Sequence, residues 1–324
     1  MKAVNDFRET YTREGLRKAI QQFFRVCIGI EDYEERFLTL NYFLNAYNDV
    51  TALPPTKDAD LRILQECDAM LLGIFDKICR KHGLSYWLDF GTLLGAYRHK
   101  GFIPWDDDMD ICMPREDFDK VVHILREELT ADGFLAQEMY QDGMEVPRSS
   151  FSFRHKETGI WLDIFPMDMY AVCKTLDKDE RQMLAVKVRK YRKAYRKIKD
   201  RTDKNAVGQY REKWLLGGNL KNGSDGSISI ICIHAPEFYY PKELIIDKED
   251  IYPLQQIQFE GITTFAPNNV KKYLSILYGS SFMDFPAKGV LKHGISRAPL
   301  STWGKTNHVD MNEVKQYLIK VLNR

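Results

Sequence analysis

Four of the five residues from 106 to 110 are aspartates: Asp106, Asp107, Asp108 and Asp110. Side chains alternate between the two faces of a β-strand, so an extended backbone places Asp108 and Asp110 on one side, about 7 Å apart. Paired carboxylates bind hard divalent cations, and Mg²⁺ prefers such oxygen ligands while keeping positions for water and phosphates. The spacing therefore favours a metal site, with Asp106 and Asp107 as supporting or loop-capping residues. A solvated acidic turn is the alternative.

The surroundings of these aspartates favour the metal site. They lead directly into the apolar segment 109–113, which a solvated turn does not need. Upstream, Gly91 and Thr92 lie where an aromatic strand at 86–89 is expected to meet a short helix through 93–97. N–H groups at a helix start bind phosphate, and glycine lets the backbone approach closely. The combination predicts a site for a metal ion and a phosphate group.

Asp163 supplies a third carboxylate. It lies in an apolar segment, 160–165, which together with 151–154 flanks the turn signal at 157–159 and predicts a β-hairpin. On a strand next to the first two aspartates, Asp163 would act as a metal ligand or as the general base for an attacking hydroxyl. A hydrogen-bonded structural aspartate is the alternative.

The elements that must position these residues alternate between helices and strands. Helical periodicity extends through 1–50, Pro54 and Pro55 break it, and a second apolar stripe over 61–78 predicts a helix that ends at Gly83. Another helix is expected over 118–125, after Pro114. We expect an N-terminal helical extension over 1–59 and a catalytic α/β domain over 60–324.

A strongly basic stretch, 187–204, holds ten Lys or Arg and two acidic residues. It belongs to a predicted basic helical insertion at about 174–226. Helical spacing places Val186, Tyr191, Tyr195 and Ile198 on one apolar face. Such a helix could dock on an anionic membrane surface, or it could pack on the domain through that face.

The composition of the 324 residues excludes several classes of protein. The formal net charge is +1, which argues against a dedicated nucleic-acid binder. The six cysteines contain no CxxC pair, so we expect reduced core thiols rather than a zinc site or a disulfide scaffold. Since the sequence shows neither a secretory signal nor a membrane span, we expect a cytoplasmic protein, peripheral at the inner face of the cell membrane at most.

The residues around the aspartates resemble a known family. The run from Gly91 to Ile111 reads Gly-Thr-Leu-Leu-Gly-Ala-Tyr-Arg-His-Lys-Gly-Phe-Ile-Pro-Trp-Asp-Asp-Asp-Met-Asp-Ile and is similar to that of LicD-type phosphotransferases. These include bacterial phosphocholine transferases and are related to fukutin-type ribitol-phosphate transferases. The segments 161–168, 259–261 and 273–279 extend the resemblance, which covers about residues 60–295.

The resemblance implies an α/β (α+β) fold of the nucleotidyltransferase type, with a mixed β-sheet flanked by helices. It implies transfer of a phospho-alcohol, in the first place phosphocholine, from a CDP-activated donor to a hydroxyl of a cell-surface glycan, teichoic acid or lipid-linked sugar. CMP would be released. Carried over to this sequence, the resemblance assigns phosphate binding to Gly91 and Thr92. It implies that Asp108 and Asp110 bind one or two Mg²⁺ ions, which Mn²⁺ can replace, and that Asp163 supplies the third carboxylate.

Further candidates are basic or aromatic. Arg98, Arg154 and His293 are candidate phosphate contacts, although a cation near a helix C-terminus, such as Arg98, is also favoured there without a ligand. Aromatic residues near the aspartates could surround a choline group or could belong to the core: Trp87, Tyr97, Trp105 and Trp161. Two other functions stay open, a nucleotidyltransferase that moves NMP itself and an inactive glycan- or lipid-binding adaptor.

Overall fold

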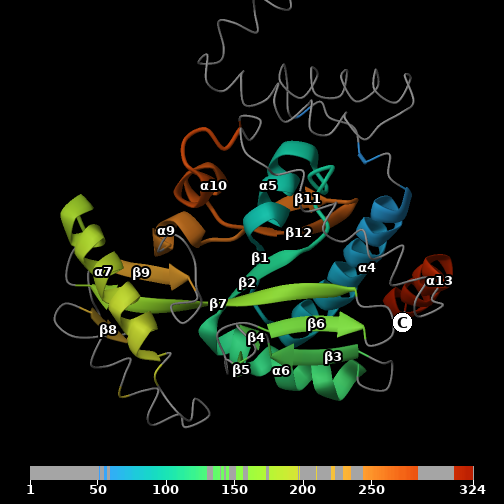
Figure 1. Ribbon diagram of the computed structural model, residues 1–324, viewed down its shortest axis with the longest axis horizontal. Coiled ribbons are helices and arrows are strands. Elements are labelled where there is room, and N and C mark those ends of the chain that lie inside the picture. The colour runs from blue at the N-terminus through green and yellow to red at the C-terminus, as the bar shows by residue number, and fades with distance from the viewer. Residues whose placement is uncertain are drawn as a thin grey trace, which may run out of the picture.

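The computed structural model describes a mixed sheet with helices on both sides (Figure 1). The described residues are 51, 55–56, 59–129, 134–138, 140–141, 144–145, 151–155, 160–172, 175–195, 197, 209, 220–222, 229–234, 244–283 and 310–323. The expected N-terminal extension lies almost entirely outside them, and so do Cys27, Cys173 and His293. The expected domain boundaries stay predictions.

Eight strands form the main sheet, in the order β1-β2-β7-β6-β3, while β8 and β9 pair with β7 and β10 pairs with β9. Only the β2–β7 pair is parallel among these strands. Their bounds are β1 Trp87–Leu88, β2 Asp110–Pro114, β3 Phe134–Glu138, β6 Phe151–His155, β7 Trp161–Val172, β8 Leu220–Asn222, β9 Ser229–His234 and β10 Ile245–Asp247. The expected mixed α/β fold is confirmed.

Two small antiparallel pairs lie outside that sheet. One is the hairpin of β11 (Gln255–Phe259) and β12 (Ile262–Ala266), and the other joins β4 (Tyr140–Gln141) to β5 (Met144–Glu145). The β11–β12 hairpin contacts β1 and α5, so it borders the region of the aspartates.

The helices pack on the sheet and on one another. Figure 1 shows α7 over β8 and β9 at one end of the sheet, and α4 with α13 at the other. Their bounds are α4 Ala59–His82, α5 Phe90–His99, α6 Arg115–Leu129, α7 Lys178–Tyr195, α9 Lys248–Ile251, α10 Val270–Tyr278 and α13 Met311–Leu322. The helices expected over 61–78, 93–97 and 118–125 are confirmed, and Gly83 ends α4 with a φ of +64°, a conformation that glycine adopts without strain. The expected basic helix is confirmed as far as Tyr195, whereas the expected helical insertion at about 174–226 also contains the strand β8.

The core explains these pairings. Buried residues of the central strand β7 and of α4 contribute to the main cluster, which includes the thiols of Cys67, Cys79 and Cys112. Burial raises the pKa of the Cys67 thiol to about 12, so it stays protonated. The expectation of reduced core thiols is confirmed for the described cysteines, of which Cys232 is the fourth.

Helix α7 corrects one expectation. Its buried face carries Leu184, Val188, Tyr191 and Tyr195, which pack against Tyr170 and neighbouring residues of β7 and β9. Val186 was expected on this face and is 37% exposed, because it lies on the opposite side of the helix from Tyr191 and Tyr195. Ile198 lies outside the described residues. The apolar face of α7 is therefore used by the domain itself.

Candidate active site

The acidic residues lie where the loop after α5 enters β2. Asp106, Asp107 and Asp108 belong to the loop, and one carboxylate oxygen of each lies within 4.8 Å of the others. Asp110 is the first residue of β2. Asp107 is buried, whereas Asp106, Asp108 and Asp110 are partly exposed. Ligand atoms of this kind and proximity can hold a divalent cation.

Asp163 joins this cluster through the parallel pairing of β2 with β7. Asp110 and Asp163 are directly opposite each other in the register, and the Asp163 amide donates to the Met109 carbonyl at 2.9 Å. Residues at matching positions of neighbouring strands present their side chains on the same face of the sheet. Trp161 Nε1 donates to Asp163 Oδ2 at 3.3 Å and so orients the carboxylate. The expected third carboxylate is therefore beside the others.

Burial and the crowding of negative charge act together on two side chains of this region. Desolvation, followed by the charges of Asp108 and Asp163, holds the pKa of the Asp110 carboxyl well above its usual range. Desolvation and then the charges of Asp110 and Asp106 also raise the pKa of the Tyr278 phenol, although 44% of that residue is exposed. Tyr278 of α10 thus borders the acidic cluster.

Gly91 and Thr92 form the first turn of α5. They contact the acidic loop, which is the segment with Asp106, Asp107 and Asp108 between α5 and β2. A Cβ atom at Gly91 would lie 2.7 Å from Asp106 Oδ2, so glycine permits the close approach of helix and loop. The hydroxyl of the buried Thr92 accepts a hydrogen bond from the Asp110 amide at 2.8 Å. The structure brings both residues to the aspartates, as expected, and gives Thr92 a role in fixing the start of β2. Phosphate binding by either residue stays a prediction.

Asp89, just before this turn, was missed by sequence reasoning. It is the N-cap of α5 and is fully buried. Its Oδ1 accepts from the Phe90 amide at 2.9 Å and from Tyr273 Oη at 3.0 Å, and its Oδ2 accepts from His234 Nε2 at 2.6 Å. An aspartate before a glycine-containing helix start is a recognisable capping signal. His234 and Tyr273 have no such signal.

The same position could be taken for a second metal site. Oxygen, sulfur and nitrogen atoms of Asp89, Cys112 and His234 lie within 4.8 Å of one another. However, both oxygens of Asp89 already accept hydrogen bonds, and burial holds the pKa of the Cys112 thiol well above its usual range. We interpret the group as a buried hydrogen-bond network that fixes the start of α5.

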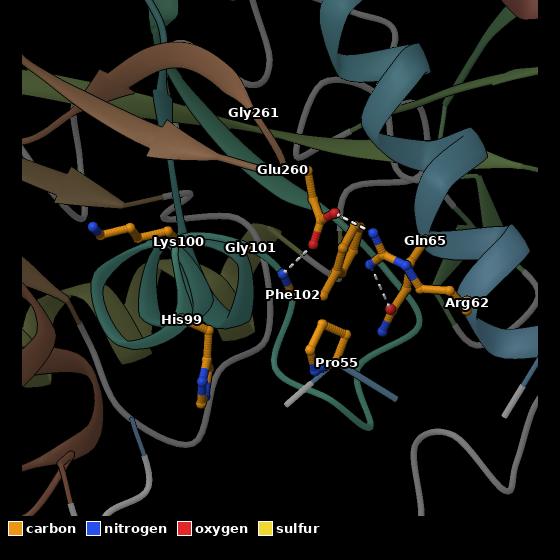
Figure 2. Close-up of a pocket in the computed structure, with 9 residues that line it drawn as sticks. All are labelled: Pro55, Arg62, Gln65, His99, Lys100, Gly101, Phe102, Glu260 and Gly261. Carbon is orange, nitrogen blue, oxygen red and sulfur yellow. Dashed lines mark hydrogen bonds and ion pairs between the residues drawn. The ribbon is translucent and has the colours of Figure 1, made fainter. Parts of the chain in front are cut away.

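Glu260 holds the other end of the acidic loop (Figure 2). Its Oε1 accepts from the Phe102 amide at 3.1 Å, its Oε2 pairs with Arg62 at 2.7 Å, and its own amide donates to the Lys100 carbonyl at 2.9 Å. Gln65 completes the connection, since its Nε2 donates to the Asp106 carbonyl at 2.9 Å. These residues line a pocket of about 410 Å³, and their polar groups are engaged with one another.

Backbone geometry supports the position of Glu260. Glu260 and Gly261 form the two-residue turn between β11 and β12, with φ values of +47° and +79°. Such turns require left-handed conformations at both positions, which glutamate adopts at some cost. A Cβ atom at Gly101 would lie 2.3 Å from Glu260 Oε1, so a side chain at this position would displace the Glu260 carboxylate.

The remaining candidates are placed differently from the cluster. Arg98 is buried in the last turn of α5, roughly 10 Å along the helix from Gly91 at 1.5 Å per residue, and its expected role at the phosphate stays a prediction. The side chain of Arg154 is outside the described residues, although its backbone pairs with Trp161. Trp87 and Trp105 are buried core residues, which leaves Trp161 and the 40% exposed Tyr97 outside the core.

Comparison with known proteins identifies the domain around this site. Residues 83–201 match the family model described as LicD/FKTN/FKRP, nucleotidyltransferase domain. The chain contains a LicD-family domain. The matched residues include the start of α5, all four aspartates of the loop and β2, and Asp163.

Two relatives show how far the similarity of the LicD-family domain extends. Lipopolysaccharide cholinephosphotransferase LicD of Haemophilus influenzae is 41% identical over 88 residues, which are 25% of this chain and 33% of that protein. Human ribitol 5-phosphate transferase FKRP is 42% identical over 57 residues, 18% of this chain and 11% of that protein. The aligned segments thus span a third or less of these relatives.

Proposed function

We propose that this chain is an Mg²⁺-dependent transferase that moves a phospho-alcohol from a CDP-activated donor to a hydroxyl of a cell-surface glycan or its lipid-linked precursor. The observation that carries the proposal is the placement of Asp110 opposite Asp163, beside the loop of Asp106–Asp108 and the start of α5. The names of the two relatives concern choline phosphate and ribitol 5-phosphate. Phosphocholine is the first donor group to test.

The carboxylate cluster fits Mg²⁺ in its chemistry. Its ligand atoms are hard oxygens, and the pKa of the Asp110 carboxyl is raised first by burial and then by the neighbouring negative charges, which a divalent cation would neutralise. Asp108, Asp110 and Asp163 would hold the ion, with Asp106 and Asp107 beside them. Bound there, the ion would neutralise charge on the transferred phosphoryl group.

The chain's own residues then have distinct roles. Asp163 accepts the proton of the acceptor hydroxyl as the bond between that oxygen and the donor phosphorus forms. The bond from phosphorus to the CMP oxygen breaks, and CMP leaves with the electron pair. The first turn of α5 would present backbone N–H groups to the donor phosphates, and Gly91 lets the Asp106 carboxylate lie close beside that turn.

The test is a donor screen with the purified chain and Mg²⁺. CDP-choline, CDP-ribitol, CDP-glycerol and CDP-ethanolamine are each offered with a glycan acceptor mixture, and CMP release is measured. We expect CMP from one of the four and none from the Asp110→Asn variant. Pyrophosphate release from a nucleoside triphosphate, without CMP from any CDP-alcohol, would instead assign NMP transfer and overturn the proposal.

A further inference from the structure

Helix α7 carries a basic outer face that is exposed in the part of the chain that the structure describes. Its side toward the sheet is buried, as described above, and its acidic residues lie in the first turn, at Asp179 and Glu180. From Arg181 to Tyr195 the sequence contains no acidic residue. The exposed cations beyond that first turn are Lys187, Arg189, Lys190, Lys193 and, just after the helix, Lys197. A concentration of this kind stands out in a chain whose net charge is +1.

Two apolar side chains lie among these cations. Met183 is 61% exposed and Val186 is 37% exposed, and both are among the few large hydrophobic residues exposed in the described chain. At 100° per residue, Met183, Val186, Lys190 and Lys193 fall on one side of the helix, opposite the buried tyrosines. The outer face therefore offers apolar contacts surrounded by positive charge.

We infer that this outer face, defined by Met183, Val186, Lys190, Lys193 and Lys197, docks the protein on an anionic lipid bilayer. Lysines next to an anionic leaflet meet headgroup phosphates, and each strengthens binding roughly fivefold. Met183 and Val186 would enter the boundary between headgroups and acyl chains. A soluble polyanion would engage only the lysines. A second copy of this face would be repelled by its like charge.

The mode of docking follows from the fold. The tyrosine face of α7 packs on β7 and β9, so the helix cannot turn that face into the bilayer without leaving the sheet. Attachment must then be shallow, dominated by electrostatics and reversible. No helix among the described residues is long and apolar enough to cross a membrane.

The experiment is co-sedimentation of the whole chain with phosphatidylcholine vesicles in which one third of the lipid is phosphatidylglycerol. We expect binding at low salt that falls steeply as the Debye length shrinks from about 30 Å at 0.01 M to about 3 Å at 1 M salt. The triple variant Lys190→Gln, Lys193→Gln, Lys197→Gln should bind on the order of 100-fold more weakly. The matched control replaces the exposed lysines Lys120, Lys271 and Lys320 by Gln and should bind as the parent does.

Two further measurements separate docking on a lipid bilayer from binding to a soluble polyanion. Met183→Ser with Val186→Ser should weaken binding to the vesicles but leave retention on a heparin column unchanged. Circular dichroism confirms that each variant is folded. Equal vesicle binding by the lysine variant and its control would overturn the inference, and so would an unchanged vesicle affinity after the serine substitutions. None of these readouts uses the transferase activity, so the inference stands or falls independently of the proposed function.

Discussion

The hydroxyl of Thr92 accepts the backbone N–H of Asp110 at 2.8 Å, which ties the first turn of α5 to the first residue of β2. The proposed phosphate-binding turn and the proposed metal-binding strand are thus held by one side-chain hydrogen bond. Thr92 is buried, so water cannot readily replace it. A threonine first interpreted as a phosphate contact therefore also sets the distance between two parts of the site.

We predict that Thr92→Val destabilises the fold by about 1–3 kcal/mol, because the Asp110 N–H loses its acceptor in a partly buried position. Mn²⁺ affinity should fall with it, since Asp110 would no longer be fixed. Thr92→Ser keeps the hydroxyl and serves as the control. Urea unfolding and calorimetric titration with Mn²⁺ measure the two effects. Parent-like values for Thr92→Val would show that this bond does not organise the site.

We predict that the Asp110 carboxyl, although needed for turnover, destabilises the fold when no metal is bound. Its pKa is raised in the folded state, so the fold binds this proton more tightly than the unfolded chain does. Without metal, stability should fall as the pH rises from the unfolded pKa through the folded one, and it should stay lower above that range. Asp110→Asn removes this dependence and should raise the melting temperature at neutral pH in the presence of a chelator.

The same substitution should lower turnover by more than about 100-fold, because loss of a catalytic metal removes several kcal/mol of transition-state stabilisation. Asp108→Asn and Asp163→Asn should behave alike in turnover. Glu127→Gln, an exposed site on α6, is the control and should leave both quantities unchanged. A stable Asp110→Asn variant that retains a tenth of the parent turnover would contradict the metal assignment.

Much of this site could be predicted from sequence because its signals are local. The hairpin turn signal at 157–159 placed Asp163 on a strand, and the apolar run after Asp108 placed Asp110 on another. Their parallel pairing followed only from the folded sheet. The buried face of α7 could not be settled by spacing alone, because two overlapping apolar stripes were available and β7 and β9 selected one.

Long-range contacts account for what was missed. Asp89 and His234 are 145 positions apart, and Arg62 and Glu260 are 198 apart. No periodicity or turn pattern links residues at such separations. The motif at 259–261 suggested importance without a role, and only the structure assigns Glu260 to the acidic loop.

Glu260 should be a positioning residue for that loop. Glu260→Gln keeps an acceptor for the Phe102 amide but loses the ion pair with Arg62, which is partly exposed, so we expect a cost of about 1 kcal/mol or less. Glu260→Ala and Gly101→Ala disturb both contacts and should cost about 1–3 kcal/mol. The three variants should also weaken Mn²⁺ affinity, Glu260→Gln less than Glu260→Ala and Gly101→Ala.

The control for this series is Gln258→Ala, which lies in the same hairpin with its side chain exposed. It should change stability by no more than about 0.5 kcal/mol. Urea unfolding gives the stability order, and Mn²⁺ titration separates loop positioning from stability. If Glu260→Ala loses stability but binds Mn²⁺ as the parent does, the contacts of Glu260 with Phe102 and Arg62 stabilise the fold without positioning the acidic loop.

The network around Asp89 yields the last prediction. His234→Ala removes the closest hydrogen-bond donor to Asp89 and should cost about 1–3 kcal/mol, because a buried oxygen is left without its partner. Tyr273→Phe removes one hydrogen bond to the same carboxylate and should cost about 1.5–3 kcal/mol. Because both donors serve Asp89, the double variant should depart from the sum of the single effects, as residues that share one partner do. Urea unfolding of the four proteins forms the cycle. Additive costs would show that His234 and Tyr273 act separately, and Asp89 would then be only a helix cap.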